Sequence, residues 1–400
     1  MTAIDAFLSI IDCGQAPYQR ATLCCGTGSA LWRATRFAIH EATPDDCGRF
    51  LDGLQRLQTQ LVGLGEKKRD RTLDGRLCGL VNTLSAVVGK DEQGLNRAAE
   101  AFEDAWLGAL PRVEPVKDAP TLPFGFDFKL DRLGAWLVYD VLWHLQHSKP
   151  GQTGRSGDGL EIREETAFLV VSAGTGPNYA LRLVAELLPG PPGLVTPDWW
   201  PMGLIVFSQP VPHASAADKD RFADFVASTQ GLLREVADRQ KPYRLRWRLE
   251  ERRAEDTPWV APITGRSGEA AVVCLGHAVY ERLTHRSHPV LNPSVAITAT
   301  VPNDHPDVRR RRLGTVNEGT IPGKFQAVES AGLREVLVAA GQRPDPLPTH
   351  PSFTRVATVA DAIMEISATN QYIRAYRGWV RAQFDDEWVE VDTPREEAAK

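Results

Sequence analysis

Hydrophobic side chains recur every three or four residues through most of residues 1–150, which is the period of an amphipathic helix. The spacing is clearest in residues 46–62, 94–110 and 130–145. Four prolines in residues 111–123 interrupt the pattern and are typical of a linker. We therefore expect a mainly helical domain over residues 1–150, suited to sensing a signal or docking a partner.

The hydrophobic pattern changes after residues 149–159, a stretch that contains four glycines. Short apolar runs of strand length, rich in branched side chains, occupy residues 168–174 and 202–208. Residues 178–188, between these two runs, have helical spacing. This mixture predicts that an α/β layer begins here, with residues 160–195 as a connecting α/β segment.

Helices and strands then alternate through residues 196–370. The periodicity predicts helices at residues 222–236, 268–283 and 323–331, and strands at residues 243–249, 295–301 and 334–338. Thr358 and Asp361 form a capping-box pattern that starts a closing helix, and a carboxy-terminal helix and polar tail are expected in residues 371–400. The expected fold class is α/β (α+β), with a helical amino-terminal region ahead of an α/β domain.

Size and charge narrow the classes of function. A chain of 400 residues is too long for one ordinary hydrophobic core, so two or three domains are expected. The formal net charge of −5 gives no basic footprint, which argues against a nucleic-acid partner. No stretch reaches the roughly 18 uninterrupted apolar residues that a membrane span requires, so no membrane partner is expected.

The amino terminus and the cysteines predict the compartment. The first residues lack a basic segment and carry Asp5 within their apolar stretch, which argues against a signal peptide. The six cysteines include no C-x-x-C pair, and Cys274 lies in an apolar helical run where a reduced thiol is expected. We therefore expect a cytoplasmic, reducing location.

One serine stands at a chemically favourable place. Residues 263–271 read I-T-G-R-S-G-E-A-A, so Ser267 lies where a loop passes into a helix of small residues. Free backbone N–H groups and the positive end of the helix dipole converge there, as an oxyanion requires. Gly268 allows the backbone to turn and a carbonyl to approach closely. Taken alone, Ser267 is more simply explained as the cap of that helix.

One lysine occupies a second favourable place. Lys324 begins a predicted helix among the apolar residues Phe325, Val328 and Ala331, and an apolar strand follows. A lysine held among apolar neighbours has its charged form disfavoured, so its pKa falls and it can act as a base near neutral pH. The alternative is a surface lysine whose aliphatic stem lies along an amphipathic helix.

The order of these segments resembles the proteolytic domain of Lon-family peptidases. The chain carries G-x-S-G-x-A, then V-A-I-T-A-T-V, then G-x-V-x-x-G-x-x-x-x-K, and finally A-G-L-x-x-V-L-V. The family has a G-P-S-A-G loop, a V-A-M-T-G-E strand, a G-G-x-x-x-K helix and an A-G-I-x-x-V-x-x-P segment. The resemblance covers about residues 195–368 and implies a Lon-like peptidase domain over residues 196–370.

Carried over residue by residue, the resemblance assigns five positions. It implies that Ser267 is the nucleophile and Lys324 its base, with Thr298 hydrogen-bonded to the lysine. Gly265 and Gly268 flank the nucleophile as supporting residues. The implied reaction is acyl transfer, in which serine attacks a peptide carbonyl and lysine takes its proton.

Three departures from the family pattern bear on activity. Arg266 replaces a proline before the serine, Glu269 replaces a glycine two residues after it, and Thr320 replaces the second glycine ahead of the lysine. A Glu269 carboxylate that points into the cleft would change specificity or keep Lys324 protonated and inactive. Arg266 and Glu269 are therefore candidate modulators of the site.

Other chemistry finds little support in the sequence. His277, His285 and His288 lack further Cys or His ligands at zinc spacing, so we expect no metal site. The glycine-rich residues 25–29 and 172–177 lack the G-K-[ST] that a phosphate-binding loop requires, so we expect no ATPase and no cofactor.

The resemblance implies a serine endopeptidase with a protein or peptide substrate, and the missing phosphate-binding loop predicts that it is ATP-independent or separately powered. A partner protein or signal would bind the amino-terminal region, and the family suggests a homo-oligomer. Stand-alone Lon-type domains fused to other modules occur in bacterial signalling and defence proteins. The alternative is a catalytically silent Lon-type fold that serves as a scaffold or protein-binding module, which Glu269, Glu318 and Thr320 favour.

Overall fold

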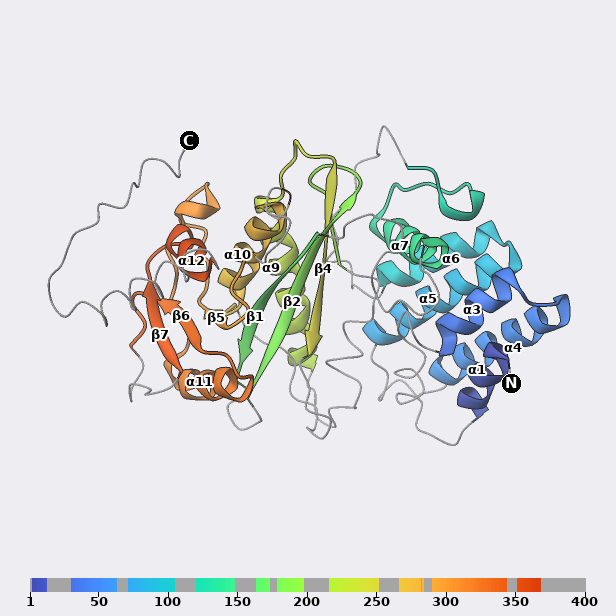
Figure 1. Ribbon diagram of the computed structural model, residues 1–400, viewed down its shortest axis with the longest axis horizontal. Helices are drawn as coiled ribbons and strands as arrows, with labels where there is room; N and C mark the ends of the chain where they lie inside the picture. The colour runs from blue at the N-terminus through green and yellow to red at the C-terminus, as the bar shows by residue number, and fades with distance from the viewer. Residues whose placement is uncertain are drawn as a thin grey trace, which may run out of the picture.

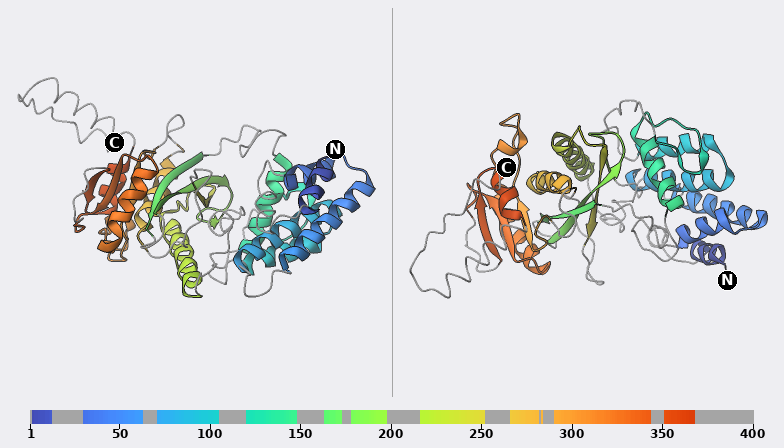
Figure 2. Two further views of the ribbon diagram at one scale, coloured as in Figure 1. Left: turned by 90° about the horizontal axis from the view of Figure 1, so that it is seen from below. Right: turned by 45° about the horizontal axis from the view of Figure 1, so that its top comes forward.

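The computed structural model describes residues 2–12, 30–62, 71–104, 120–147, 163–172, 178–197, 216–251, 266–281, 283, 290–343 and 351–367. These residues form ten α-helices and a seven-stranded mixed sheet, with helices mainly in the amino-terminal part and strands in the carboxy-terminal part. The fold class is α/β, as predicted. Figures 1 and 2 show the helices before residue 148 gathered at one side of the molecule and the strands at the other.

The amino-terminal region is helical, as the hydrophobic period predicts. Its helices are α1 (Ala3–Asp12), α3 (Ala30–His40), α4 (Pro44–Val62), α5 (Arg71–Gly89), α6 (Glu92–Asp104) and α7 (Leu133–His147). Their apolar stripes meet in one core, where Phe7 and Phe50 pack edge to face at 5.3 Å between ring centres. The proline-rich residues 111–119 lie outside the described residues.

A single mixed sheet organises the rest of the chain. Its strands are β1 (Arg163–Val171), β2 (Tyr179–Pro189), β3 (Val195–Pro197), β4 (Tyr243–Glu251), β5 (Val295–Thr298), β6 (Glu335–Ala339) and β7 (Ser352–Val356). They lie in the order β3-β4-β2-β1-β5-β6-β7. Strand β2 pairs antiparallel with both β1 and β4, whereas β5, β6 and β7 extend the sheet from β1 in parallel.

The helix expected at residues 178–188 is wrong, because this segment is strand β2. Strands β1 and β4 pair with its two edges, and every position from Ala180 to Leu188 except Arg182 is buried. A strand covered on both faces has a nearly continuous apolar run and loses the alternation that marks a strand. The described residues 163–172 and 178–197 contain β1, β2 and β3 of this sheet. Residues 202–208 lie outside the described residues.

The other predicted elements that fall on described residues are confirmed, whereas the carboxy-terminal helix and tail expected in residues 371–400 lie outside them. The helices are α9 (Ala216–Val236), α10 (Glu269–Glu281), α11 (Ile321–Ser330) and α12 (Val359–Ile366), with short 3-10 turns at Pro123–Gly125, Val308–Arg310 and Glu318–Thr320. The predicted strands at residues 243–249, 295–301 and 334–338 correspond to β4, β5 and β6. Thr358 and Asp361 form the predicted capping box at the start of α12. Strand β7 was not predicted.

The alternation of side chains along β1 places α10 and α11 on opposite faces of the sheet. Leu169 belongs to the core cluster that contains the apolar residues of α10. Its neighbours Phe168 and Val170 belong to a second cluster, which contains Phe325 and Val328 of α11. Because successive strand residues point to opposite faces, β1 lies between the two helices.

Helix α7 contacts the sheet through buried charged side chains. Asp140 on α7 accepts hydrogen bonds from both terminal nitrogens of Arg244 on β4. Arg246 pairs with Glu186 of β2 and donates to His144 Nε2 of α7 at 3.0 Å. These residues are all at least nine-tenths buried, so the helical region and the sheet share a polar contact that excludes water.

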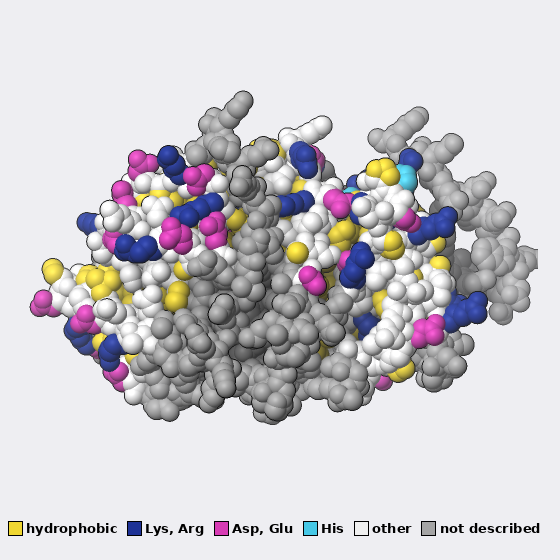
Figure 3. Space-filling view, turned by 180° about the vertical axis from the view of Figure 1, so that it is seen from behind, with side chains coloured by type: hydrophobic (Ala, Val, Ile, Leu, Met, Phe, Trp, Pro, Cys, Tyr) yellow, Lys and Arg dark blue, Asp and Glu magenta, His cyan; other side chains and the backbone are white. Residues whose placement is uncertain are grey.

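The surface of the described residues mixes the two signs of charge. In Figure 3, Lys and Arg side chains lie interspersed with Asp and Glu side chains over the described part of the face. No helix among the described residues combines the length and apolarity that crossing a membrane requires.

Candidate active site

The loop before α10 is held against the chain that leaves β5. Residues Arg266–Gly268 form a turn, and α10 begins at Glu269. The carbonyl of Ser267 accepts a hydrogen bond from Ala299 N at 2.9 Å, and Ala270 N donates to Ala299 O at 3.3 Å. Ser267 therefore lies at a helix start, as predicted, on a loop that is paired with a neighbouring segment.

Gly268 lies in close contact with a side chain of the sheet. A β-carbon at this position would lie 2.9 Å from Leu169 Cδ2, which is closer than side chains pack. Glycine therefore lets the loop lie directly on β1, next to the nucleophile position. Gly265 lies outside the described residues.

Lys324 lies in the first turn of α11 and its side chain is buried, with 5% of the residue exposed. Its Nζ lies 2.8 Å from Ser267 Oγ and 3.0 Å from Thr298 Oγ1. A third oxygen, the carbonyl of Val170 in β1, lies 2.9 Å from the same nitrogen. The structure thus brings together the serine, the lysine and the threonine that the sequence singled out.

The surroundings of Lys324 favour its neutral form. All three oxygens in contact with Nζ belong to uncharged groups. Burial lowers the pKa of Lys324 from 10.5 to about 8, because the ammonium form loses its hydration without gaining a carboxylate partner. The amine is therefore available as a proton acceptor at mildly alkaline pH.

The start of α11 also approaches β1 closely. A β-carbon on Gly323 would collide with Ser172 Oγ and with the side chain of Asn178. Asn178 in turn donates a hydrogen bond to Gln326 of α11 at 2.8 Å. These contacts bring Lys324 within reach of Val170, and sequence reasoning named neither Gly323 nor Val170. A glycine directly before the candidate lysine was the signal available.

Glu269 does not face Lys324. Its carboxylate, on a residue 4% exposed, accepts from Ser228 Oγ at 2.8 Å and Arg266 Nε at 2.6 Å. Its other oxygen accepts from Val301 N at 2.8 Å. Lys324 Nζ contacts other groups, so the contact that would keep the lysine protonated is not formed.

Two backbone donors remain at the helix start. Within the described part of the chain, the N–H groups of Ser267 and Gly268 have no acceptor. Both precede α10, where the dipole and the free N–H groups favour negative charge. They are the available donors for an oxyanion beside Ser267 Oγ.

A cleft of about 370 Å³ opens over the serine and the lysine. Its apolar wall includes Leu169, Val171 and Phe225, and its polar wall includes Thr315 and Asn317. The space lies within the range of natural ligand sites, which combine an apolar lining with a few polar groups. The cleft therefore gives a bound group access to Ser267.

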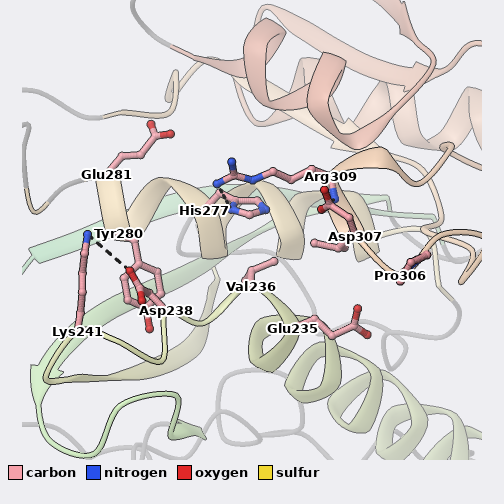
Figure 4. A pocket seen from close by; sticks show the side chains of 11 residues that line it. Glu235, Val236, Asp238, Lys241, His277, Tyr280, Glu281, Pro306, Asp307 and Arg309 are labelled. Atoms are coloured by element: carbon pink, nitrogen blue, oxygen red, sulfur yellow. Dashed lines mark hydrogen bonds and ion pairs between the residues drawn. The ribbon is translucent and has the colours of Figure 1, made fainter. Parts of the chain in front are cut away.

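A second cavity, of about 620 Å³, lies along the carboxy-terminal half of α10 (Figure 4). His277 faces it, and its Nδ1 accepts from Arg309 at 3.2 Å. Burial, then the charge of Arg309, lowers the pKa of His277 to about 4, so this imidazole is neutral near pH 7. The described residues contain no group of three metal-binding side chains, and His285 and His288 lie outside them.

Neither models of protein families nor curated protein sequences match this chain. A functional assignment therefore depends on the contacts described above. The most informative of them is the 2.8 Å contact between Ser267 Oγ and Lys324 Nζ, which joins residues far apart in the chain.

Proposed function

We propose that this chain is a Lon-like serine endopeptidase that uses Ser267 and Lys324 as a catalytic dyad and needs no ATPase or cofactor of its own. The observation that carries the proposal is the contact of 2.8 Å between Ser267 Oγ and Lys324 Nζ, inside a buried site of uncharged oxygens. A nucleophile and its base require hydrogen-bond reach, roughly 2.6–3.2 Å.

The hydrogen-bond pattern suits the neutral lysine. A neutral amine has two N–H donors and one lone pair, and it has three neighbours here. The carbonyl of Val170 can only accept, and Thr298 Oγ1 takes the second N–H. In the proposed neutral state the lone pair is left for the third contact, 2.8 Å from Ser267 Oγ, where the serine hydroxyl can rotate to donate to Nζ.

The first half of the reaction forms an acyl-enzyme. Ser267 Oγ forms a bond to the peptide carbonyl carbon while its proton passes to Lys324 Nζ. The N–H groups of Ser267 and Gly268 stabilise the oxyanion that develops on the carbonyl oxygen. The C–N bond then breaks, and the lysine gives its proton to the leaving amine.

The second half restores the enzyme. Water occupies the place of the departed amine and gives a proton to Lys324 as its oxygen attacks the acyl carbon. The proton returns to Ser267 Oγ when the ester bond breaks. Each step uses the same two side chains, so the lysine must be neutral at the start of each half-reaction.

The proposed function includes a substrate, a regulatory partner and a cellular location. The substrate is a protein or peptide, and the helical region of residues 1–150 binds a partner or signal that selects it, as in signalling or defence proteins of bacteria. A homo-oligomer is the proposed assembly. Cys47 and Cys274, two of the described cysteines, are free thiols, which suits the proposed reducing, cytoplasmic location.

One argument for the alternative function, a catalytically silent scaffold, does not hold. It depended in part on a Glu269 carboxylate that holds Lys324 protonated. The oxygens of Glu269 are engaged by Ser228, Arg266 and Val301 instead. We therefore keep the peptidase as the proposed function.

Covalent labelling tests the proposal. The purified full chain is treated at pH 9 with a fluorophosphonate probe, and the labelled peptide is located by mass spectrometry. We expect a single adduct on Ser267 that Ser267→Ala abolishes and that Ser294→Ala retains, because Ser294 stands ahead of β5. Absence of a Ser267-dependent adduct in wild type would overturn the peptidase.

A further inference from the structure

Glu269 joins three segments that surround the candidate nucleophile. One carboxylate oxygen accepts from Ser228 of α9 and from Arg266 of the nucleophile turn, at 2.8 and 2.6 Å. The other accepts from Val301 N, three residues beyond Thr298, at 2.8 Å. Only 4% of the residue is exposed, so the carboxylate works in a medium that strengthens these bonds.

A buried carboxylate needs compensation, and this one has it. Burial of an unpaired carboxylate is strongly unfavourable, whereas charged hydrogen bonds are about twice as strong as neutral ones. Glu269 also stands in the first turn of α10, where the helix dipole favours negative charge. Its arrangement is therefore satisfied and rigid rather than strained.

The contacts of Glu269 flank the serine on the same two segments. Ser267 O accepts from Ala299 N at 2.9 Å, and Glu269 Oε2 accepts from Val301 N at 2.8 Å. Together with the bonds from Ala270 N to Ala299 O and from Arg266 to Val301 O, these contacts join the nucleophile turn and the start of α10 to the chain that leaves β5. That chain begins at Thr298, whose hydroxyl contacts Lys324 Nζ at 3.0 Å.

We propose that Glu269 is a positioning residue that holds Ser267 Oγ in register with Lys324 by tying the nucleophile turn to α9 and to the end of β5. The inference rests on the proposed function. It differs from a role in tuning the base, because Glu269 contacts no atom of Lys324. Its removal displaces the serine and leaves the proton affinity of the lysine unchanged.

Glutamine is the informative replacement. Glu269→Gln keeps the size of the side chain but offers one acceptor oxygen and one amide nitrogen. Because donors approach both carboxylate oxygens, the amide nitrogen must face at least one of them. The variant therefore breaks one side of the clamp without opening a cavity.

The experiment measures how fast the fluorophosphonate probe labels Ser267 as a function of probe concentration and pH. We expect Glu269→Gln to lower the maximal rate about 10- to 100-fold, since a displacement of about 1 Å can cost that much. The probe concentration for half-maximal rate should not change. The pH midpoint should stay near 8, where the pKa of Lys324 lies.

Two further variants control the result. Ser228→Ala removes one donor of the clamp from outside the cleft and should lower the maximal rate about threefold. Glu329→Gln removes an exposed carboxylate from α11 and should leave the rate unchanged. The thermal unfolding midpoint of Glu269→Gln shows whether this variant folds. If it does not fold, the labelling rate of Ser228→Ala still tests the positioning role.

The outcomes separate this inference from the function on which it rests. If wild type labels and folded Glu269→Gln or Ser228→Ala labels equally fast, the positioning role is overturned while the dyad stands. A shift of the pH midpoint in Glu269→Gln also overturns it, because Glu269 then acts on the base. Absence of labelling in wild type overturns the proposed function itself.

Discussion

Lys324 in the first turn of α11 and Arg244 in β4, which faces α7, are both almost fully buried. Arg244 donates to both oxygens of Asp140, and its guanidinium lies over the Trp136 ring at 5.3 Å. Lys324 has three uncharged oxygens around it and no carboxylate in contact. The buried cation at Arg244 therefore has a carboxylate partner, whereas the buried amine at Lys324 has none among its contacts.

The difference separates a structural cation from a chemical one. A guanidinium keeps its proton in proteins, so burial forces it to take a carboxylate partner. A lysine amine can lose its proton instead, and burial lowers the pKa of Lys324 to about 8. The pair at Arg244 thus holds two regions together, whereas the unpaired Lys324 is able to exchange a proton.

The largest expected effect is loss of chemistry at Lys324. Lys324→Met replaces the lysine with an unbranched apolar side chain of similar length, which removes the base. We expect the rate at which the fluorophosphonate labels Ser267 to fall on the order of 10³-fold or more. The measurement is labelling at pH 9, and a rate within tenfold of wild type would contradict the role of the lysine.

Lys324→Met should still fold, unlike a variant that breaks the ion pair of a buried structural cation. Below pH 8 the wild type buries a protonated amine, and above about pH 10.5 the amine is neutral in both folded and unfolded chains. The stability of wild type relative to Lys324→Met should therefore rise as the pH increases from 8 to 10.5. Chemical denaturation at several pH values measures this difference, and a fall over that range would contradict it.

The opposite pattern is expected at the paired arginine. Asp140→Ala leaves the buried Arg244 without its carboxylate, so the free energy of unfolding should fall by about 3–5 kcal/mol. Thermal or chemical unfolding provides the measurement. Asp91→Ala is the matched control, because Asp91 pairs with Arg97 on the surface and such pairs contribute about 1 kcal/mol or less. Equal losses in both variants would remove the distinction between the two sites.

Lowering the pH should reduce the labelling rate through Lys324 but should leave the Arg244–Asp140 pair and the fold intact. Because the protonated amine cannot accept the serine proton, the labelling rate should fall about tenfold for each pH unit below 8. Between pH 6 and pH 8 the fold should persist, as far-UV circular dichroism can check. A labelling rate that is independent of pH across this range would exclude Lys324 as the base.

The smallest expected effect concerns the threonine beside the lysine. Thr298→Val removes the hydroxyl that lies 3.0 Å from Nζ and keeps the shape of the side chain. One hydrogen bond of about 1 kcal/mol corresponds to a labelling rate about fivefold lower. The Arg244–Asp140 ion pair is unchanged in Thr298→Val, so the free energy of unfolding should fall far less than in Asp140→Ala. A loss as large as that of Lys324→Met would place Thr298 in the chemistry itself.

Several parts of this protein follow from local sequence. The three- and four-residue spacing in residues 46–62 appears as α4, and the capping pattern at Thr358 appears as the start of α12. Ser267 was predicted at a helix start and Lys324 in the first turn of another helix, and both are found there. These features depend on hydrogen bonds and apolar faces within a few residues, so a short window of sequence suffices.

Other parts depend on which elements become neighbours. Strand β2 has helical spacing but becomes an interior strand of the sheet, because β1 and β4 satisfy its backbone groups while α10 and α11 pack against its two faces. The direction of Glu269 was equally open, since Ser228 and Val301 lie 41 and 32 residues away from it.

Sequence by itself determined the helical elements, the turn at Ser267 and the apolar surroundings of Lys324. The tertiary structure alone decided that the Val170 carbonyl is a third oxygen at Lys324 Nζ, and that Glu269 faces away from this nitrogen. The physical reason is that a buried charge takes whatever partners the packing of distant elements supplies. At Arg244 the packing supplies a carboxylate, and at Lys324 it supplies oxygens without charge.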